Sequence, residues 1–219
     1  MIIVVGGEKG GTGKTTLATT LAALRAADGR DVLLVDTDKQ RTASFWATVR
    51  GEASDGDRGA PARVRHVQML GKGITREVPD LAERYDDVVV DAGGRDSIEL
   101  RAAALVADRL FVPIRPTQFD SWTLEHVNDL VEEAQTFNPR LRAYVVLNLA
   151  STHPRVREAE EAAEYVGEFE HLELADVCLR DRIAFSRAAA SGLAVTEVEE
   201  PDRKAVAEAR AWYDAAFAE

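Results

Sequence analysis

Residues 1–17 read MIIVVGGEKGGTGKTTL, and this stretch decides the fold. A short run rich in β-branched residues, over residues 1–5, is followed by a glycine-rich loop and then by an alanine-rich segment with leucines at helical spacing. The pattern predicts a strand buried on both faces, a glycine loop and a helix over residues 14–27. A glycine loop between a strand and a helix is the setting of a phosphate-binding loop, because the N–H groups at the start of the helix attract anions.

The loop supplies both backbone and side chains for a nucleotide. Its glycines let N–H groups turn toward phosphate oxygens, Lys14 can reach the β- and γ-phosphates, and the Thr15 hydroxyl can bind Mg²⁺. The general pattern has glycine five positions before Gly13, where this chain has Glu8, followed by a second lysine, Lys9. The expected nucleotide-binding residues of the loop are Lys9, Gly10, Gly11, Thr12, Gly13, Lys14, Thr15 and Thr16.

Strands and helices are expected to alternate through the rest of the chain. Further strands are predicted at residues 32–35, 64–67, 87–90, 110–114, 143–149 and 177–179. Helices are predicted around residues 45–49, up to 85, through 105, over 121–136, over 158–168 and from 202 to the end. Residues 51–61, rich in Gly, Asp and Ser, are expected to form a surface loop. The predicted fold is α/β, a doubly wound, mostly parallel sheet with helices on both faces, in one domain over residues 1–219.

Composition limits the classes of function. The chain has 219 residues, of which 46% are hydrophobic and 30% charged, as expected of one globular domain. Its net charge of −11 should repel DNA and anionic membranes except at a local basic patch. A single cysteine, Cys178, provides neither an intrachain disulfide nor enough ligands for a zinc or iron–sulfur site. We expect a cytoplasmic protein without a signal segment or a membrane span.

Acidic residues follow two of the predicted strands. Asp36 and Asp38 come after residues 32–35, and Asp91 comes after residues 87–90. Because the carboxyl ends of parallel strands meet at one edge of a sheet, these side chains should lie near the glycine loop. Phosphoryl transfer depends on positioning and charge, so carboxylates there can orient a water molecule or hold Mg²⁺. Helix capping is the alternative role for them.

The loop, KGGTGKTT at residues 9–16, resembles the deviant Walker A loop of the ParA and MinD ATPases, and AGG at residues 92–94 is similar to the small plasmid-type ParA partition proteins. The resemblance implies a Mg²⁺-dependent ATPase that holds two ATP molecules between two chains. It implies catalytic roles for Lys9, Lys14 and Asp38, with Lys9 reaching the partner's nucleotide and Asp38 positioning the attacking water. The implied metal residues are Thr15, Asp36 and Asp91. Asn148 matches a position at which relatives hydrogen-bond adenine, although asparagine is also a common turn residue.

The resemblance also implies partners: a homodimer formed with ATP, a ParB-like or other activating protein, and DNA or other cargo that slow ATP hydrolysis positions. Relatives use basic residues in the C-terminal third on non-specific DNA. The candidates here are Arg180, Arg182, Arg187, Arg203 and Lys204, for which salt bridges are the alternative. MinD-like relatives bind membranes through a basic amphipathic helix, but residues 208–219 carry one arginine and several acids, so we expect no membrane binding.

Three other functions stay open on the sequence. A MinD-like ATPase acting on another surface would share every motif described above. A metabolic ligase of the dethiobiotin-synthetase type shares the fold and the phosphate loop, but its dimer should not depend on nucleotide. A nucleotide-binding scaffold with negligible turnover would be distinguished by measuring phosphate release.

Overall fold

The computed structural model describes residues 1–54, 60–93, 98–116, 123–153 and 158–218. Its strands are β1 (Ile2–Gly6), β2 (Val32–Asp36), β3 (Arg65–Gln68), β4 (Asp87–Ala92), β5 (Arg109–Ile114), β6 (Arg142–Ala150) and β7 (Glu173–Arg180). Its helices are α1 (Lys14–Ala27), α2 (Thr42–Ser54), α3 (Ile74–Ala82), α4 (Ile98–Ala104), α6 (Leu124–Phe137), α7 (Glu158–Val166), α8 (Ile183–Ala190) and α9 (Arg203–Phe217), with a short 3₁₀ turn at Gly71–Gly73.

The strands form one parallel sheet in the order β3-β2-β4-β1-β5-β6-β7, so the predicted α/β doubly wound fold is confirmed. β1 lies at the centre, between β4 and β5. Its side chains alternate between two cores, since Ile2 and Val4 pack on one face while Ile3 and Val5 pack on the other. Burial on both faces explains why β1 has a continuous apolar sequence rather than an alternating one.

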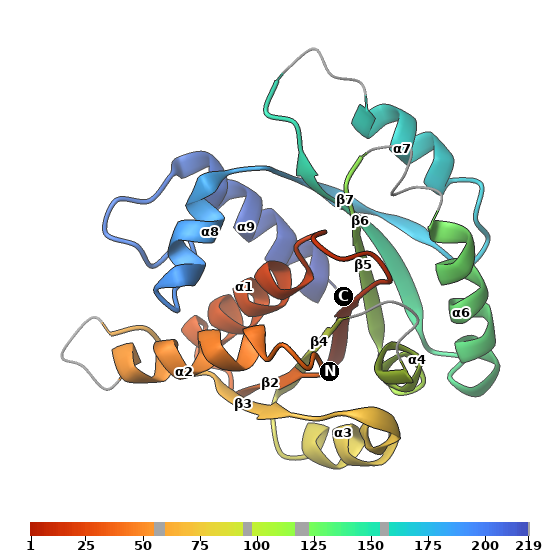
Figure 1. Ribbon diagram of the computed structural model, residues 1–219, viewed down its shortest axis with the longest axis horizontal. Coiled ribbons are helices and arrows are strands. Elements are labelled where there is room, and N and C mark those ends of the chain that lie inside the picture. Colours follow the sequence, from red (N-terminus) through yellow and green to blue (C-terminus); the bar gives the residue numbers. More distant parts are fainter. Residues whose placement is uncertain (55–59, 94–97, 117–122, 154–157, 219) are drawn as a thin grey trace.

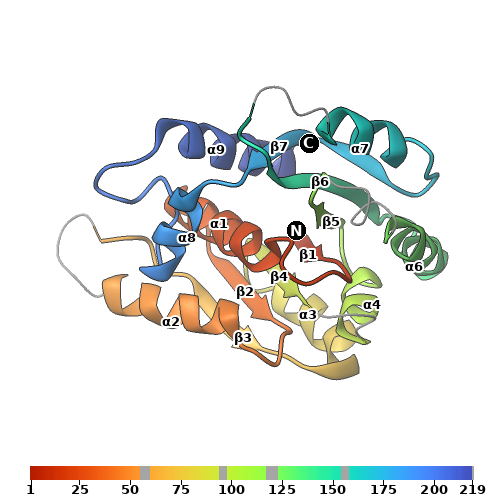
Figure 2. The same ribbon diagram turned by 45° about the horizontal axis from the view of Figure 1, so that its top comes forward.

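Two layers of helices cover the sheet (Figure 1 and Figure 2). The apolar clusters place α1, α2, α8 and α9 on one face and α3, α4, α6 and α7 on the other. Trp212 of α9 is fully buried, donates its Nε1–H to the carbonyl oxygen of Leu17 at 3.2 Å, and meets the ring of Phe111 edge-on with centroids 4.8 Å apart. These contacts hold α9 against both α1 and the centre of the sheet.

A buried arginine fixes α2 in place. Arg50 has no exposed surface, and its Nη1 and Nη2 donate to the two carboxylate oxygens of Glu197 at 2.8 and 2.7 Å. The same guanidinium donates to the carbonyl oxygens of Ala62 and Gly192, at 2.7 and 3.1 Å, and lies 5.3 Å from the ring centroid of Trp46. Arg50 therefore joins α2 to the segment before β3 and to the segment between α8 and α9.

The structure corrects three of the predicted boundaries. The loop predicted over residues 51–61 is wrong at its start, because residues 51–54 form the last turn of α2. The last strand is longer than residues 177–179, since β7 runs from 173 to 180, and α8 was not predicted. The helix predicted over residues 121–136 is observed from Leu124, and residues 117–122 lie outside the described part of the chain.

A membrane span was not expected. Within the described ranges, no helix combines the length and apolar character that crossing a bilayer requires.

Candidate functional site

The glycine loop lies between β1 and α1 and borders a cavity of about 530 Å³. Gly13, which precedes α1, has a φ of 87°, and a Cβ there would lie 2.3 Å from Nδ2 of Asn148. Only glycine satisfies both the backbone angle and the lack of space. The cavity is lined by Glu8, Lys9, Gly10, Gly11, Gly13, Lys14, Thr15, Thr16, Asp38 and Gly93. It therefore brings together most of the predicted loop residues and the predicted water-positioning acid.

Lys14 is nearly buried at the first position of α1, with 8% of its surface exposed. Its Nζ donates to the carbonyl oxygen of Lys9 at 2.7 Å. Desolvation lowers the pKa of Lys14, while the nearby carboxylates of Asp91 and Asp38 act in the opposite direction. A phosphate entering the cavity can replace the Lys9 carbonyl as the acceptor, because an anion is the stronger partner for an ammonium group.

Asp91, at the end of β4, and Thr15 fit a magnesium site. Asp91 Oδ2 accepts a hydrogen bond from the Thr15 hydroxyl at 2.7 Å, whereas its buried Oδ1 has no partner among the described residues. The pKa of Asp91 is raised to about 7, chiefly by burial and also by the charge of Asp36, while the hydrogen bond from Thr15 opposes this shift. No group of three or more His, Cys, Asp or Glu side chains in the described ranges could hold a metal. One carboxylate and one hydroxyl agree with Mg²⁺, which keeps several waters and binds through few protein ligands.

Asp36 is fully buried at the end of β2, directly across from Asp91 in the sheet. Its Oδ2 accepts from the backbone N–H and the hydroxyl of Ser44, at 2.7 and 2.8 Å, and its Oδ1 accepts from the N–H of Asp38 at 3.0 Å. These bonds tie the first turn of α2 to the loop after β2, as the capping alternative implies. The contact with Ser44 had no signal in the sequence, and a metal role for Asp36 stays a prediction.

Asp38 and Lys9 line the same cavity from different segments. Asp38 Oδ1 accepts from the N–H of Gln40 at 2.9 Å, which closes a turn just before α2. A Cβ at Gly93 would lie 2.7 Å from Asp38 Oδ2. Only a residue without a side chain therefore lets the segment after β4 approach this carboxylate so closely.

Asn148, near the end of β6, contacts the glycine loop itself. It is 5% exposed, and its Nδ2 donates to the carbonyl oxygen of Thr12 at 2.7 Å. A second, smaller cavity of about 100 Å³ lies beside it, lined by Gly13, Thr16, Leu17, Asn148, Leu149, Leu179, Arg180, Asp181, Arg182, Phe185 and Ser186. Adenine binding by Asn148 stays a prediction, and its contact with the loop had no signal in the sequence.

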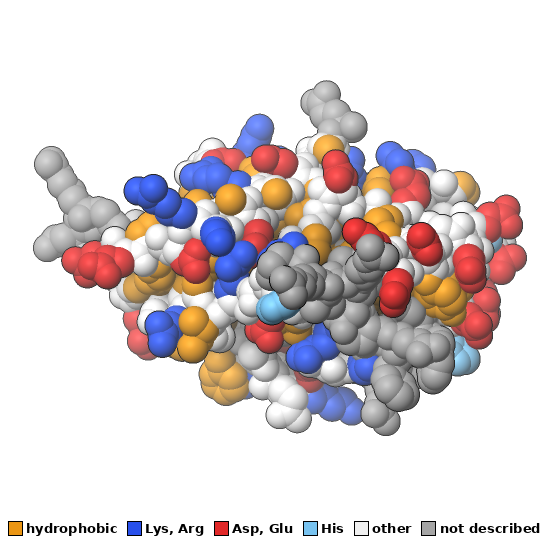
Figure 3. Space-filling view, turned by 90° about the horizontal axis from the view of Figure 1, so that it is seen from above, with side chains coloured by type: hydrophobic (Ala, Val, Ile, Leu, Met, Phe, Trp, Pro, Cys, Tyr) orange, Lys and Arg blue, Asp and Glu red, His pale blue; other side chains and the backbone are white. Residues whose placement is uncertain are grey.

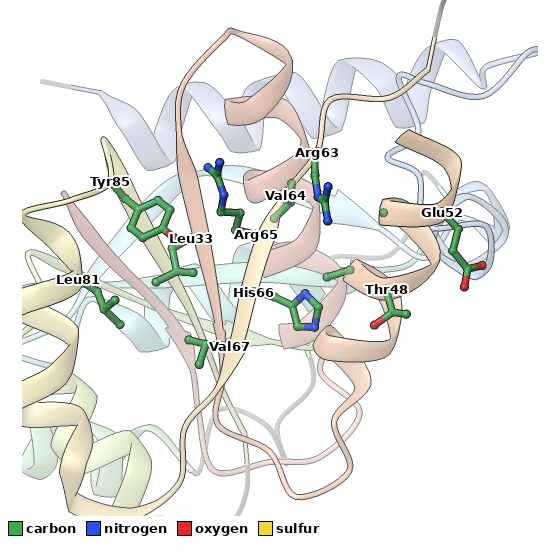
Figure 4. Close-up of a pocket in the computed structure, with 12 residues that line it drawn as sticks. Leu33, Thr48, Glu52, Arg63, Val64, Arg65, His66, Val67, Leu81 and Tyr85 are labelled. Carbon is green, nitrogen blue, oxygen red and sulfur yellow. The ribbon is translucent and has the colours of Figure 1, made fainter. Parts of the chain in front are cut away.

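A larger cavity lies elsewhere, along the edge strand β3 between α2 and α3, with a volume of about 740 Å³ (Figure 4). Arg63, Arg65 and His66 line it together with apolar side chains such as Val67. Arg65 forms an exposed salt bridge with Asp31 at 2.5 Å. This cavity shares no lining residue with the cavity at the glycine loop, which holds the groups suited to phosphate chemistry.

Comparison with known families agrees with this geometry. The family model for the CobQ/CobB/MinD/ParA nucleotide-binding domain matches residues 3–195. The chain belongs to this ParA/MinD family. The predicted family is thereby confirmed.

Individual family members show what the chain is similar to. The maintenance of carboxysome distribution protein A of Halothiobacillus neapolitanus is 28% identical over 213 residues, covering 94% of this chain and 91% of that protein. A putative plasmid partition protein from Borrelia burgdorferi bound to AMPPNP superposes with a TM-score of 0.73 at 17% identity, covering 98% and 97% of the two chains. MinD from Pyrococcus horikoshii complexed with Mg-ADP gives 0.69 at 17% identity, covering 98% and 93%.

We expect the buried carboxyl of Asp91 to lower the free energy of unfolding of this ParA/MinD-family protein once it is ionised. The pKa of Asp91 is about 7 in the folded chain, whereas the ordinary value is 3.8. The stability that the protonated carboxyl contributes is therefore fully present below about pH 3.8 and is lost as the pH rises through 7. The difference between the two pKa values corresponds to at most about 4 kcal/mol. Without nucleotide or Mg²⁺, Asp91→Asn should therefore be more stable than the wild type, by a margin that grows by roughly 3 kcal/mol from about pH 5 to about pH 8. Urea unfolding at both pH values measures the margin, and a margin independent of pH would contradict the assignment.

Proposed function

We propose that residues 1–219 form a single ATPase domain that dimerises with ATP, hydrolyses it slowly with Mg²⁺ and uses this cycle to position cargo. The observation that carries the proposal is the cavity in which Lys9, Lys14 and Asp38 meet around the glycine loop. Two lysines on one loop exceed what a single triphosphate site in a phosphate loop needs. Because the loop resembles the deviant Walker A loop, Lys9 is assigned to the nucleotide of a partner chain.

Each side chain has a defined task in this proposal. The loop N–H groups and Lys14 bind the phosphates, and Thr15 with Asp91 would hold Mg²⁺, which neutralises phosphate charge when bound. Asp38 accepts a hydrogen bond from the attacking water and orients it toward the γ-phosphate. Because Gln40 holds Asp38 in a turn, the carboxylate has a fixed direction before water arrives.

The ATP-dependent dimer is the first test. Asp38→Ala should bind ATP within about 3-fold of the wild type yet release phosphate at least about 100-fold more slowly, because it removes water positioning rather than affinity. Static light scattering should therefore show this variant accumulating as a dimer with ATP. Lys9→Ala should bind ATP and stay monomeric.

Asp80→Ala, an exposed acid on α3, serves as the control and should behave as the wild type in every measurement. A normal ATP-dependent dimer of Lys9→Ala would contradict the role across the interface. A dimer that forms equally without nucleotide would instead favour the metabolic ligase.

The cargo is proposed from charge and from relatives. One relative distributes carboxysomes, and one structural neighbour is a putative plasmid partition protein. Figure 3 shows Lys and Arg side chains interspersed with Asp and Glu in its left half, where α8 and α9 lie, and a band of Asp and Glu at its right end, where α6 and α7 lie. We propose non-specific DNA as the track, with a ParB-like or other activating protein as partner.

The structure divides the five basic candidates for DNA contact. Arg182 forms a 2.8 Å salt bridge with Glu208, and Arg180 Nη1 donates to the carbonyl oxygen of Ser151, so both guanidinium groups already have partners. Arg187 and Lys204 are exposed and adjoin Ala188 and Ala205, which pack in one apolar cluster between α8 and α9. Arg203 is exposed beside Lys204. Arg187, Arg203 and Lys204 are therefore the residues proposed to contact phosphates.

DNA binding should require ATP, because a monomer of charge −11 carries too few basic residues on one face and dimerisation doubles the patch. We expect the Asp38→Ala dimer to be retained on non-specific DNA at roughly 50 mM salt, and retention to weaken steeply as salt rises. Replacing Arg187, Arg203 and Lys204 by alanine should abolish retention while ATP hydrolysis stays unchanged. Arg182→Ala is the matched control, and equal loss in that variant, or no retention of the dimer at low salt, would contradict the proposed surface.

A further inference from the structure

We propose that Arg115 and Asn148 act together as a clamp that aims two N–H groups of the glycine loop at the phosphates. The inference rests on the proposed function and adds two positioning residues to it. Arg115 Nη2 donates to the carbonyl oxygen of Gly11 at 3.2 Å, and Asn148 Nδ2 donates to that of Thr12 at 2.7 Å. Two consecutive carbonyl groups of the loop are thus held by two side chains from outside the loop.

The sheet explains why these two side chains reach neighbouring atoms. β5 and β6 are adjacent and parallel, with Ile114 paired to Leu147. Arg115 directly follows Ile114 and Asn148 directly follows Leu147, so the two residues lie at the same level of the carboxyl edge. β5 also pairs with β1, which leads directly into the loop. The clamp is therefore built on three neighbouring strands of the rigid centre of the sheet.

Peptide geometry converts this contact into an orientation. In a trans peptide the C=O and the N–H point in opposite directions. Arg115 holds the carbonyl of Gly11, so the N–H of Thr12 in the same peptide points away from Arg115. Asn148 holds the carbonyl of Thr12, so the N–H of Gly13 points away from Asn148. Gly11 and Gly13 both have positive φ, at 75° and 87°, and backbone N–H groups in such turns form concave sites for anions.

The clamp should raise phosphate affinity by preorganising the loop, because the loop then loses less freedom when phosphate binds. This role differs from adenine recognition by Asn148, which would act on the base alone. A side chain that aims the loop must affect every ligand carrying phosphates by a similar factor. A side chain that recognises only the adenine base must leave the affinity for a ligand without a base unchanged.

The test is the affinity of the full chain for ADP and for inorganic pyrophosphate, measured by calorimetry with Mg²⁺. We expect Asn148→Ala and Arg115→Ala each to weaken both ligands by about 10-fold, the order of magnitude of one lost hydrogen bond. Asn148→Asp, which cannot donate, should be at least as weak as Asn148→Ala, whereas Arg115→Lys should recover part of the loss. The double variant should lose less than the product of the two factors, because both groups hold one short loop.

Matched controls separate this effect from general damage. Arg109, at the other end of β5, also donates to a backbone carbonyl, that of Ala216 at 2.9 Å, and Asn138 donates to that of Ala107 at 2.7 Å. Arg109→Ala and Asn138→Ala should lower thermal stability without changing either affinity. If ADP binds more weakly to Asn148→Ala while pyrophosphate binds normally, Asn148 reads the base and the clamp is wrong. If the wild type binds both ligands and the variants match it, the clamp alone fails; if the wild type binds neither, the proposed function fails as well.

Discussion

Lys14→Ala should abolish measurable ATP hydrolysis and weaken ATP binding by at least about 100-fold. Lys14 is the nearly buried cation at the start of α1, with Nζ 2.7 Å from a carbonyl that phosphate can replace. Hydrogen bonds from a charged donor are worth about 1.5–3 kcal/mol each, and a triphosphate offers at least two acceptors. Calorimetry with ATP and a phosphate-release assay measure the two effects.

Lys72, exposed on the 3₁₀ turn far along the chain, provides the control for this substitution. Lys72→Ala removes the same charge from the molecule and should leave both measurements at wild-type values. Lys14→Ala with an ATP affinity within about 3-fold of the wild type would contradict the assignment of the glycine loop to phosphate.

Arg50→Ala should lower the free energy of unfolding by about 3–5 kcal/mol, the usual cost of breaking a buried ion pair by removing one partner. The substitution leaves Glu197 without its two hydrogen bonds from Nη1 and Nη2, and the carbonyl groups of Ala62 and Gly192 lose a donor. Urea unfolding should show a lower midpoint, while the slope of the unfolding free energy against urea concentration stays unchanged. The thermal midpoint should fall by roughly 10 °C.

The matched control for Arg50 is an arginine in an exposed salt bridge. Arg65 pairs with Asp31 while both side chains are more than half exposed, at 59% and 51%. Exposed pairs are worth about 0–1 kcal/mol, so Arg65→Ala should change the unfolding free energy little. If Arg50→Ala and Arg65→Ala lose similar amounts of unfolding free energy, the burial of Arg50 does not determine its contribution to stability.

The sequence predicted the centre of the fold well because burial leaves a strong local signal there. Strands β1, β2, β4 and β5 are buried on both faces, and their central residues therefore form continuous apolar runs. The phosphate loop was predictable for a similar reason, since Gly13 and Lys14 are required by local geometry. The family, the fold and the set of residues around the loop followed from these short segments.

Features that depend on distant contacts were not predictable. Gly51 indicates a loop, yet α2 continues through it because Arg50 binds Glu197, 147 residues away in sequence. Asn148 and Arg115 contact the loop across 136 and 104 residues, and nothing in their neighbouring sequence marks those partners. α8 is short, and its order depends on packing against α9 and on the segment that Arg50 holds. In each case tertiary contacts override local preference.

The central position of β1 has a consequence for synthesis on the ribosome. Ile2 is made before its partners, because Val88 on β4 and the residues of β5 that pair with β1 follow more than eighty residues later. At a synthesis rate of about 5–20 residues per second, roughly 4–17 s pass between translation of β1 and translation of β4, the first strand that pairs with it. During that interval an unpaired apolar strand is exposed, and such segments aggregate. We therefore expect the newly made chain to aggregate less when β1 is shielded until β4 has emerged.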